Sequence, residues 1–353
     1  MLTLPRPLWL FVVLVAACSS DELGAPPSRD STEVVRYHVE EIPAPEGYGS
    51  TTPGGINQAG IIAGSLDGRP DTTFIHSPGV TQVLNVFDEV SEASAINARG
   101  DIVGTRMQPG RLDTFKPFQW LNGDRYPSDL MTVLPESAVD GVGSDINEAQ
   151  VVVGTFEIHE AGLKPRPFVY DNATRKVTVL HPPGATYAYG TAINAANQVV
   201  GHLWGVTGAG FVHDLASGEY SSLAFEPEAI NASGLVVGNR DAATPIVKQL
   251  GGSDVLLPTF GTSLCRALAV NNAGVIVGTA SPPEATTNDD VVAVSFESGH
   301  VVNLNERLVG DASWHVIAAH DINDAGVIVG LALRVDDPSR RLRGVRLVPV
   351  TAP

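Results

Sequence analysis

The chain has 353 residues, a formal net charge of −17 at pH 7, 43% hydrophobic residues, 36 glycines and 25 prolines. So acidic a chain argues against nucleic acid as a partner, because phosphate backbones bind basic surfaces. The high glycine and proline content, together with the hydrophobic content, favours a turn-rich all-β globular protein over a disordered chain.

The N-terminal segment 1–17 has the organisation of a signal peptide. Arg6 supplies a positive charge before the apolar run Leu8–Ala17, which is too short to span a bilayer. The small residues before Cys18 resemble a bacterial lipobox, which predicts cleavage at this point and a lipid on Cys18. An ordinary signal peptide, cut after Ala17, is the alternative.

Residues 18–32 are rich in Ser, Pro and Asp and predict a flexible tether before a domain at 33–353. Ser19 and Ser20, rather than Asp, follow the cysteine. By resemblance to Gram-negative sorting patterns, this favours the outer membrane. We therefore expect a lipoprotein that crosses the inner membrane and resides at the outer membrane, facing the periplasm or the cell surface.

The domain contains seven copies of one short pattern: Ile or Val, Asn, two variable residues, a turn residue, three mostly apolar residues and Gly. The seven anchoring asparagines are Asn57, Asn97, Asn147, Asn194, Asn231, Asn271 and Asn323. They are spaced 37 to 52 residues apart. A period in this range is typical of propellers and solenoids.

Each copy predicts a tight β-hairpin. Asn suits the first position of a type I turn, where its side chain can bond the backbone two residues on. The residues three positions later are Gly60, Gly100, Gln150, Asn197, Gly234, Gly274 and Gly326. Gly and Asn tolerate a positive φ, as a type I turn with a G1 bulge requires. At Gln150 we expect either strain or a different turn.

The residues around the turn predict strands that are buried on both faces. Adjacent apolar residues such as Ile102 and Val103 point to opposite faces of a strand, as in stacked blades. Two positions before each asparagine stand Gly55, Ala95, Asp145, Ala192, Ala229, Ala269 and Asp321, mostly small residues. Small side chains allow an innermost strand to crowd close to a central axis.

Two further strand-like runs follow each hairpin, so every repeat predicts four short strands. Four strands repeated seven times describe a seven-bladed β-propeller. The chain ends in a third strand, 344–350, and begins with an unmatched strand, 35–42. Pairing of these two segments would complete the last blade and close the ring without free edges.

No catalytic or cofactor motif stands out. Neither HExxH, CxxC nor GxSxG occurs. The segments Asp321–Asp324 and Asn288–Asp290 carry oxygen ligands suited to calcium, but neither matches an EF-hand loop. We therefore expect no metal or cofactor, with calcium the one candidate kept open. Cys265 lies in a predicted inner strand and is interpreted as a small buried hydrophobe.

Function is expected where the blades differ, in the loops that lead into the inner strands. At roughly equivalent places these loops present Tyr48, Glu92, Asp140, Tyr189, Glu228, Arg266 and His320. Together they predict a ligand-binding rim at the mouth of the central channel. Glu228 or Asp140 could pair with His320 for acid/base chemistry, whereas solvated loop residues would produce the same set.

The Ile-Asn-x-x-Gly-x-Val-Val-Gly core resembles the bacterial extracellular repeat family named for a His-Ala-Phe signature (the HAF repeat). The resemblance covers 55–350. The signature triplet itself departs from the family: Thr72-Thr73-Phe74, Lys116-Pro117-Phe118 and Arg166-Pro167-Phe168 keep the Phe but lack the His. The resemblance implies a secreted protein, and no role for that histidine carries over.

We therefore predict an envelope-anchored propeller that acts as a binding or scaffolding module, with an envelope protein or polysaccharide as partner. One alternative is a propeller enzyme that acts on polysaccharide at the channel mouth. Convergence of Asp, Glu, His and Arg within hydrogen-bond reach would favour it. The other alternative is a structural envelope component without a binding pocket.

Overall fold

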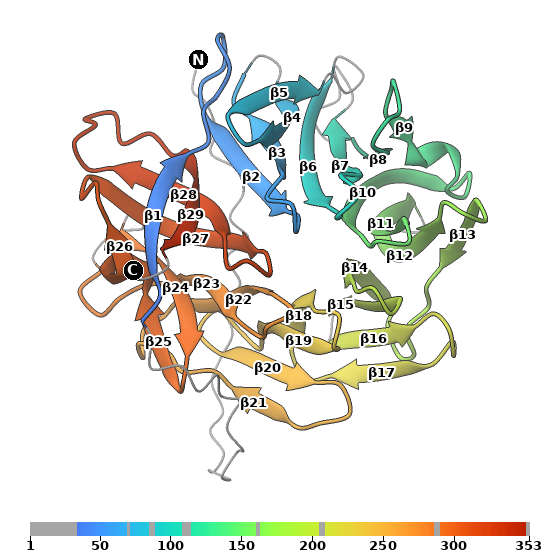
Figure 1. Cartoon of the computed structure of the whole chain (residues 1–353). Coiled ribbons are helices and arrows are strands. Elements are labelled where there is room, and N and C mark those ends of the chain that lie inside the picture. The colour runs from blue at the N-terminus through green and yellow to red at the C-terminus, as the bar shows by residue number, and fades with distance from the viewer. Residues whose placement is uncertain are drawn as a thin grey trace.

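The computed structural model describes residues 34–68, 71–84, 89–107, 114–159, 163–204, 209–285 and 290–350. Within these ranges the chain forms seven β-sheets, arranged as blades around a central axis (Figure 1). The predicted seven-bladed β-propeller is confirmed. The proposed signal peptide, Cys18 and the tether lie outside the described residues.

In each of the first six blades, four consecutive strands pair in order from the axis outward. Blade 1 contains β2 (Thr51–Ile56), β3 (Ile62–Leu66), β4 (Thr72–Ser77) and β5 (Val80–Leu84). Blade 2 contains β6 (Val90–Ile96), β7 (Ile102–Met107), β8 (Phe115–Trp120) and β9 (Ser128–Asp129), followed by the 3-10 helix η1 (Leu130–Thr132). Blade 3 contains β10 (Ala138–Ile146), β11 (Val151–His159), β12 (Leu163–Asp171) and β13 (Lys176–Val179).

Blades 4 to 6 follow the same order. Blade 4 contains β14 (Tyr187–Ile193), β15 (Gln198–Trp204), β16 (Gly210–Asp214) and β17 (Tyr220–Leu223). Blade 5 contains β18 (Glu226–Ile230), β19 (Leu235–Asn239), β20 (Pro245–Gln249) and β21 (Asp254–Leu256). Blade 6 contains β22 (Cys265–Val270), β23 (Ile276–Ala280), β24 (Val292–Glu297) and β25 (His300–Asn303), followed by the 3-10 helix η3 (Leu304–Arg307).

Blade 7 joins the two ends of the chain. Its sheet runs β27 (Trp314–Ile322), β28 (Ile328–Arg334), β29 (Arg343–Val350), β1 (Arg36–Glu41) and β26 (Leu308–Val309). β1 pairs antiparallel with β29, which confirms the predicted closure. Two ion pairs tie the strands: Arg346 Nε lies 2.7 Å from Glu40 Oε2, and Arg343 Nη1 lies 2.9 Å from Glu41 Oε1.

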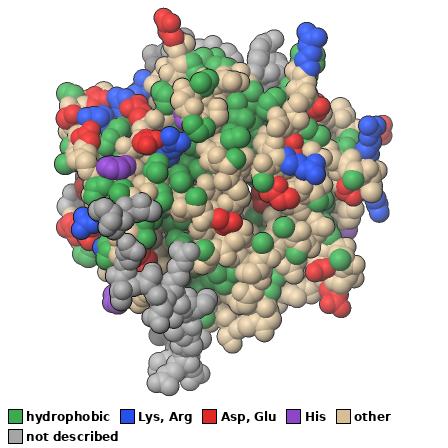
Figure 2. All heavy atoms as spheres, viewed as in Figure 1, with side chains coloured by type: hydrophobic (Ala, Val, Ile, Leu, Met, Phe, Trp, Pro, Cys, Tyr) green, Lys and Arg blue, Asp and Glu red, His purple; other side chains and the backbone are tan. Residues whose placement is uncertain are grey.

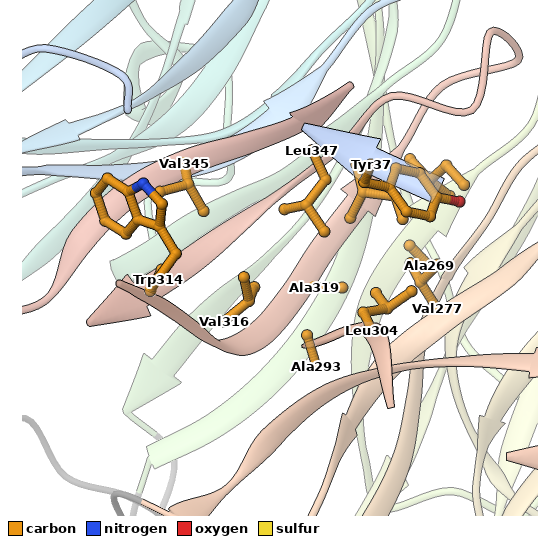
Figure 3. Close-up of a cluster of buried hydrophobic side chains, with 13 residues drawn as sticks. Tyr37, Ala269, Val277, Ala293, Leu304, Trp314, Val316, Ala319, Val345 and Leu347 are labelled. Atoms are coloured by element: carbon orange, nitrogen blue, oxygen red, sulfur yellow. The ribbon is translucent and has the colours of Figure 1, made fainter. Parts of the chain in front are cut away.

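The closing strand is also held by apolar packing. Tyr37 of β1 is buried in a cluster with Leu347 and Leu304 (Figure 3). Beyond the prediction, the outer edge of β1 pairs in parallel with the short strand β26, so the N-terminal strand has a partner on each side. This arrangement leaves β1 no long free edge.

The predicted hairpin turns are confirmed. In blade 1, Asn57 N donates to Ile61 O (2.9 Å) and Gly60, at φ 77°, donates from its N to Asn57 O (3.0 Å). Gln150 keeps the same turn, since its N donates to Asn147 O at 3.0 Å, but at φ 60°. Of the two outcomes expected for Gln150, strain or a different turn, the first is observed, as a left-handed backbone at a non-glycine residue.

The seven asparagines also link the blades, which the turn pattern did not predict. Each Nδ2 donates to the backbone carbonyl of the corresponding asparagine in the next blade, at 3.0 or 3.1 Å. The last of these bonds runs from Asn323 to Asn57 O and closes the circle. All seven asparagines are buried, so these bonds are shielded from water. We call this circle the asparagine ring.

The glycine that ends each copy is required by close packing. A Cβ on Gly64 would lie 2.8 Å from Cε1 of the buried Phe74, and would also meet the carbonyl oxygen of Thr52. Gly154 is placed in the same way against Phe168. This confirms the predicted close approach of backbone at these positions. Among the described residues, no helix is long and apolar enough to cross a membrane.

Candidate functional site

The inner strands β2, β6, β10, β14, β18, β22 and β27 surround the axis (Figure 1), and each carries a β-bulge shortly before its asparagine. The bulge turns two successive residues to the same side. For example, a Cβ on Gly54 or on Gly55 would contact the inner strand of blade 2. The accessible side chains of the inner strands therefore form three layers, which we call the outer, middle and deep layers.

The layers differ in composition. The outer layer consists of Thr52, Glu92, Val142, Tyr189, Glu226, Arg266 and Ala318, each paired with the residue that follows a closing glycine. The middle layer consists of the bulge residues Gly54, Ser94, Ser144, Thr191, Glu228, Leu268 and His320. The deep layer consists of Gly55, Ala95, Asp145, Ala192, Ala229, Ala269 and Asp321 and borders the asparagine ring.

Five of the seven predicted rim residues lie in these layers. Glu92, Tyr189 and Arg266 occupy the outer layer, and Glu228 and His320 occupy the middle layer. They are therefore not at equivalent places, and that part of the prediction is wrong. The inner-strand bulge, which sequence spacing does not reveal, separates the two groups.

The other two predicted residues lie elsewhere. Tyr48 precedes β2 and packs, partly buried, against the apolar cluster that includes Ile42 and Ile56. Asp140 lies two residues upstream of the outer layer in β10, where its Oδ1 accepts the backbone N–H of Phe115 (2.7 Å) and of its neighbour Gly141 (2.8 Å). Their placement at the same level as the other five is corrected accordingly.

Glu228 and Arg266 form an ion pair between blades 5 and 6. Glu228 Oε1 also accepts a hydrogen bond from Asn239 Nδ2 at 3.3 Å, while Asn239 bonds the backbone of Ala267 with both of its amide atoms. This group therefore fixes two neighbouring blades relative to each other. It also holds one carboxylate and one guanidinium at the level of the outer and middle layers.

His320 is not brought together with Glu228 in the way that acid/base chemistry would need. The two residues lie in blades 7 and 5, and Leu268 of blade 6 stands between them in the middle layer. The Nδ1 atom of His320 lies 3.0 Å from the carbonyl oxygen of Pro53, across the closing junction of the ring. Glu228 and His320 therefore contact different junctions between neighbouring blades.

The deep layer contains two carboxylates, Asp145 and Asp321, which were not among the predicted rim residues. Asp145 accepts the backbone N–H of Ile146 (2.8 Å) and of Ile193 in the next blade (2.9 Å). Asp321 does the same with Ile322 (2.8 Å) and Ile56 (2.9 Å). Each carboxylate thus accepts hydrogen bonds from two backbone N–H groups of inner strands, at the edge of the sheet that has no further strand beside it. The available signal was that they are the only charged residues in a column of Gly and Ala.

Burial changes the acidity of this pair. Each residue keeps some accessible surface, but its carboxyl group is enclosed by protein atoms, which raises the pKa of Asp145 to about 6 and of Asp321 to about 7. The four backbone donors act in the opposite direction, and the charge of Asp145 raises the pKa of Asp321 further. Near neutral pH the deep layer therefore carries a titratable acid pair.

An aromatic corner, formed by Tyr187, Tyr189 and Trp204, lies where the inner strand of blade 4 begins. We call this end of the blades the mouth end. The rings of Tyr189 and Trp204 meet edge to face, with centroids 6.1 Å apart, and Tyr187 pairs directly opposite Trp204. Burial, and after it the charge of Glu157 on blade 3, raises the pKa of Tyr189. Trp204 is nevertheless 45% exposed. Tyr189 was among the predicted rim residues but Trp204 was not, because only the pairing of β14 with β15 brings the two rings together.

Other described groups offer less chemistry. A small open pocket of about 80 Å³ between β12 and the start of β14 is lined by Arg166, His181 and Tyr187 among others. The described residues contain no group of three or more His, Cys, Asp or Glu side chains that could hold a metal ion. Burial raises the pKa of the Cys265 thiol to about 11, which fits its interpretation as an unreactive core residue.

The segments considered for calcium have other contacts. Asp324 accepts hydrogen bonds from the backbone N and the Nδ2 of Asn272 (2.8 and 2.9 Å), Asn323 belongs to the asparagine ring, and Asp321 bonds backbone amides. Residues 288 and 289 of the second segment lie outside the described residues. Calcium therefore stays a prediction without a defined site.

Comparison with known proteins finds only distant structural similarity. No protein-family model matches it, and no curated protein sequence does. TolB from Acinetobacter baumannii is similar in structure, with a TM-score of 0.39, 15% identity, and coverage of 57% of this chain and 51% of that one. A putative TolB from Agrobacterium tumefaciens has a TM-score of 0.43 and 9% identity, with coverage of 64% and 89%.

A third similar structure is the extracellular domain of a putative one-component system from B. thetaiotaomicron. Its TM-score is 0.49 at 9% identity, with coverage of 90% of this chain and 40% of that one. The chain thus spans about half the length of Acinetobacter baumannii TolB. We draw neither a function nor a partner from these distant proteins.

Proposed function

We propose that this protein is an envelope-anchored propeller of the HAF-repeat type that binds a polar ligand at the mouth end of its ring. The anchor at Cys18, the outer-membrane location and the family are supported by sequence features alone. A polysaccharide or a protein of the envelope remains the proposed partner. The binding role is supported by the structure of the ring.

The observation that carries the binding role is the contrast between the two ends of the inner strands. At one end all seven blades use the same buried asparagine, so this end is uniform. At the other end the seven positions of the outer layer hold six different residue types, including Tyr189 and Arg266, and only Glu occurs twice. Structural repetition needs no such variety, whereas recognition of one asymmetric ligand does.

The mouth end also has the mixed chemistry of a binding site. It combines aromatic surface at Tyr189 and Trp204 with the fixed ion pair of Glu228 and Arg266. Apolar area with a few positioned polar groups is the usual composition of ligand sites. On the face drawn in Figure 2, Lys and Arg side chains are scattered among acidic and apolar ones, rather than gathered into one basic patch.

The proposal is tested by a thermal-shift screen of the purified protein against calcium chloride, soluble fragments of envelope glycans and a peptide library. A ligand present at about 100 times its dissociation constant should add roughly 2.7 kcal/mol to the unfolding free energy. The screen is repeated with Glu228→Ala and His320→Ala, and with Tyr126→Ala as a control. Tyr126 is 67% exposed and lies in the loop after β8. This loop is at the end of the blades opposite the mouth, where the asparagine turns lie, which we call the hairpin end.

The binding role predicts a ligand whose thermal shift is reduced by Glu228→Ala or His320→Ala but not by Tyr126→Ala. A shift that all three variants retain would place the ligand elsewhere on the molecule. Absence of any shift across the screen would refute binding at the mouth and leave the structural role.

A further inference from the structure

The aromatic corner of blade 4 has a composition that suits one particular ligand class. Tyr187, Tyr189 and Trp204 lie on the same side of the β14–β15 hairpin, since Tyr187 pairs with Trp204 and Tyr189 is two residues from Tyr187. Tyr189 and Trp204 meet at an interplanar angle of 65°, so the faces of the two rings point in different directions. Trp204 is 45% exposed, so part of its ring surface is open to stacking by a compact ligand ring.

This corner is held rigidly between its neighbours. On one side Gly190 N donates to Thr155 Oγ1 of blade 3 at 3.0 Å. On the other side His202, paired opposite Tyr189, places its Nε2 atom 2.8 Å from the carbonyl oxygen of Pro227 in blade 5. A binding surface whose supports are already hydrogen-bonded loses little entropy when a ligand docks.

Carboxylates flank the corner on both sides. Glu157 of blade 3 lies close enough for its charge to act on Tyr189, and Glu226 occupies the adjoining place in the outer layer of blade 5. Carboxylate oxygens are strong acceptors for hydroxyl groups. With a chain charge of −17, this setting repels anionic ligands.

We propose that the corner formed by Tyr187, Tyr189 and Trp204 binds a pyranose ring of a neutral oligosaccharide or polysaccharide. The C–H face of the sugar would stack on the electron-rich face of an aromatic ring, and its hydroxyl groups would donate to Glu157 or Glu226. This inference rests on the proposed binding role and names the ligand class. A basic peptide, the other class attracted by aromatic rings and carboxylates, is the competing result.

The test uses the purified full chain and an immobilised panel of neutral bacterial, fungal and plant oligosaccharides, with hexalysine as the basic probe. Hits are titrated at low and high NaCl concentration while tryptophan fluorescence is followed. The variants are Trp204→Ala, Tyr189→Ala and the control Tyr126→Ala, which removes an exposed aromatic ring from the hairpin end. Trp204→Phe keeps an aromatic ring but removes the indole.

We expect at least one neutral oligosaccharide to bind with little dependence on salt. Trp204→Ala and Tyr189→Ala should weaken it at least tenfold, Tyr126→Ala should not, and Trp204→Phe should retain binding while losing the fluorescence change. Failure of the whole panel to bind, or binding that is insensitive to Trp204→Ala, overturns the inference. Salt-sensitive binding of hexalysine that requires Trp204 overturns it too, but leaves the proposed binding role standing.

Discussion

Removing one member of the asparagine ring should destabilise the propeller strongly for the size of the change. Asn231 is 5% exposed, and its Oδ1 accepts the backbone N–H of Ser233 (3.0 Å) and of Leu235 (2.9 Å). Its Oδ1 also accepts the hydroxyl of Ser233 (2.8 Å), while its Nδ2 donates to Asn271 O at 3.0 Å. Asn231→Ala removes all four bonds.

The cost follows from these contacts. An intramolecular hydrogen bond contributes about 0.5–1.5 kcal/mol, and more is lost when a buried partner stays unpaired. The three bonds to backbone groups alone therefore predict a loss of roughly 2–4 kcal/mol in unfolding free energy. This is a large part of the stability of a typical domain.

The assay is equilibrium unfolding in urea, with equal denaturant slopes required before free energies are compared. Asn231→Asp separates the two roles of the side chain, because it retains the turn acceptor but faces the carbonyl of Asn271 with an oxygen. It should therefore keep the turn bonds but lose the ring bond, with an added cost from the buried carboxylate that faces a carbonyl oxygen. The control Gln58→Ala removes one exposed acceptor of Asp324 N and should stay within about 0.5 kcal/mol of wild type. A change below about 0.5 kcal/mol for Asn231→Ala would refute this reasoning.

Three further predictions concern the ring closure, the acid pair and the turns. Tyr37→Ala removes a buried aromatic ring from the closing strand and should cost roughly 3–5 kcal/mol in urea unfolding, with a smaller loss counting against tight closure. Because burial raises the folded-state pKa values of Asp145 and Asp321 to about 6 and about 7, their contribution to stability falls as pH rises from about 4 to about 7. The melting temperature of Asp145→Asn/Asp321→Asn should therefore improve relative to wild type between pH 5 and pH 8, and a constant difference would contradict the shifts. Arg175 is exposed and has a φ of 55°. Its replacement by Gly should raise the unfolding free energy by up to about 1 kcal/mol in the same urea assay. A lower unfolding free energy would show that the Arg175 side chain contributes more stability than the backbone strain costs.

The sequence could predict the fold because the repeat unit carries its own instructions. The hairpin at Asn57 and Gly60 depends on residues within four positions of each other, so local chemistry determines it. The chain carries seven copies of one local unit, and the last copy lacks its outer strand, which β1 supplies by pairing with β29. These features permit few arrangements other than a closed ring. The repeat therefore determined the blade number, the hairpins and the closing pair.

The candidate site was less accessible to sequence reasoning, because it depends on contacts between blades. The inner-strand bulge shifts Glu228 and His320 to a different layer from Tyr189, and no residue pattern marked that shift. The partner of Trp204 is set by the register of β14 against β15.

By itself, then, the sequence determined what lies within one repeat: the turn, the strand order and the number of copies. Only the tertiary structure decided how each repeat meets the next. The asparagine ring and the enclosure of Asp145 and Asp321 arise when inner strands far apart in the chain converge on one axis. Their physical cause is the unpaired inner edge of each sheet, whose backbone groups must find partners in the neighbouring blade.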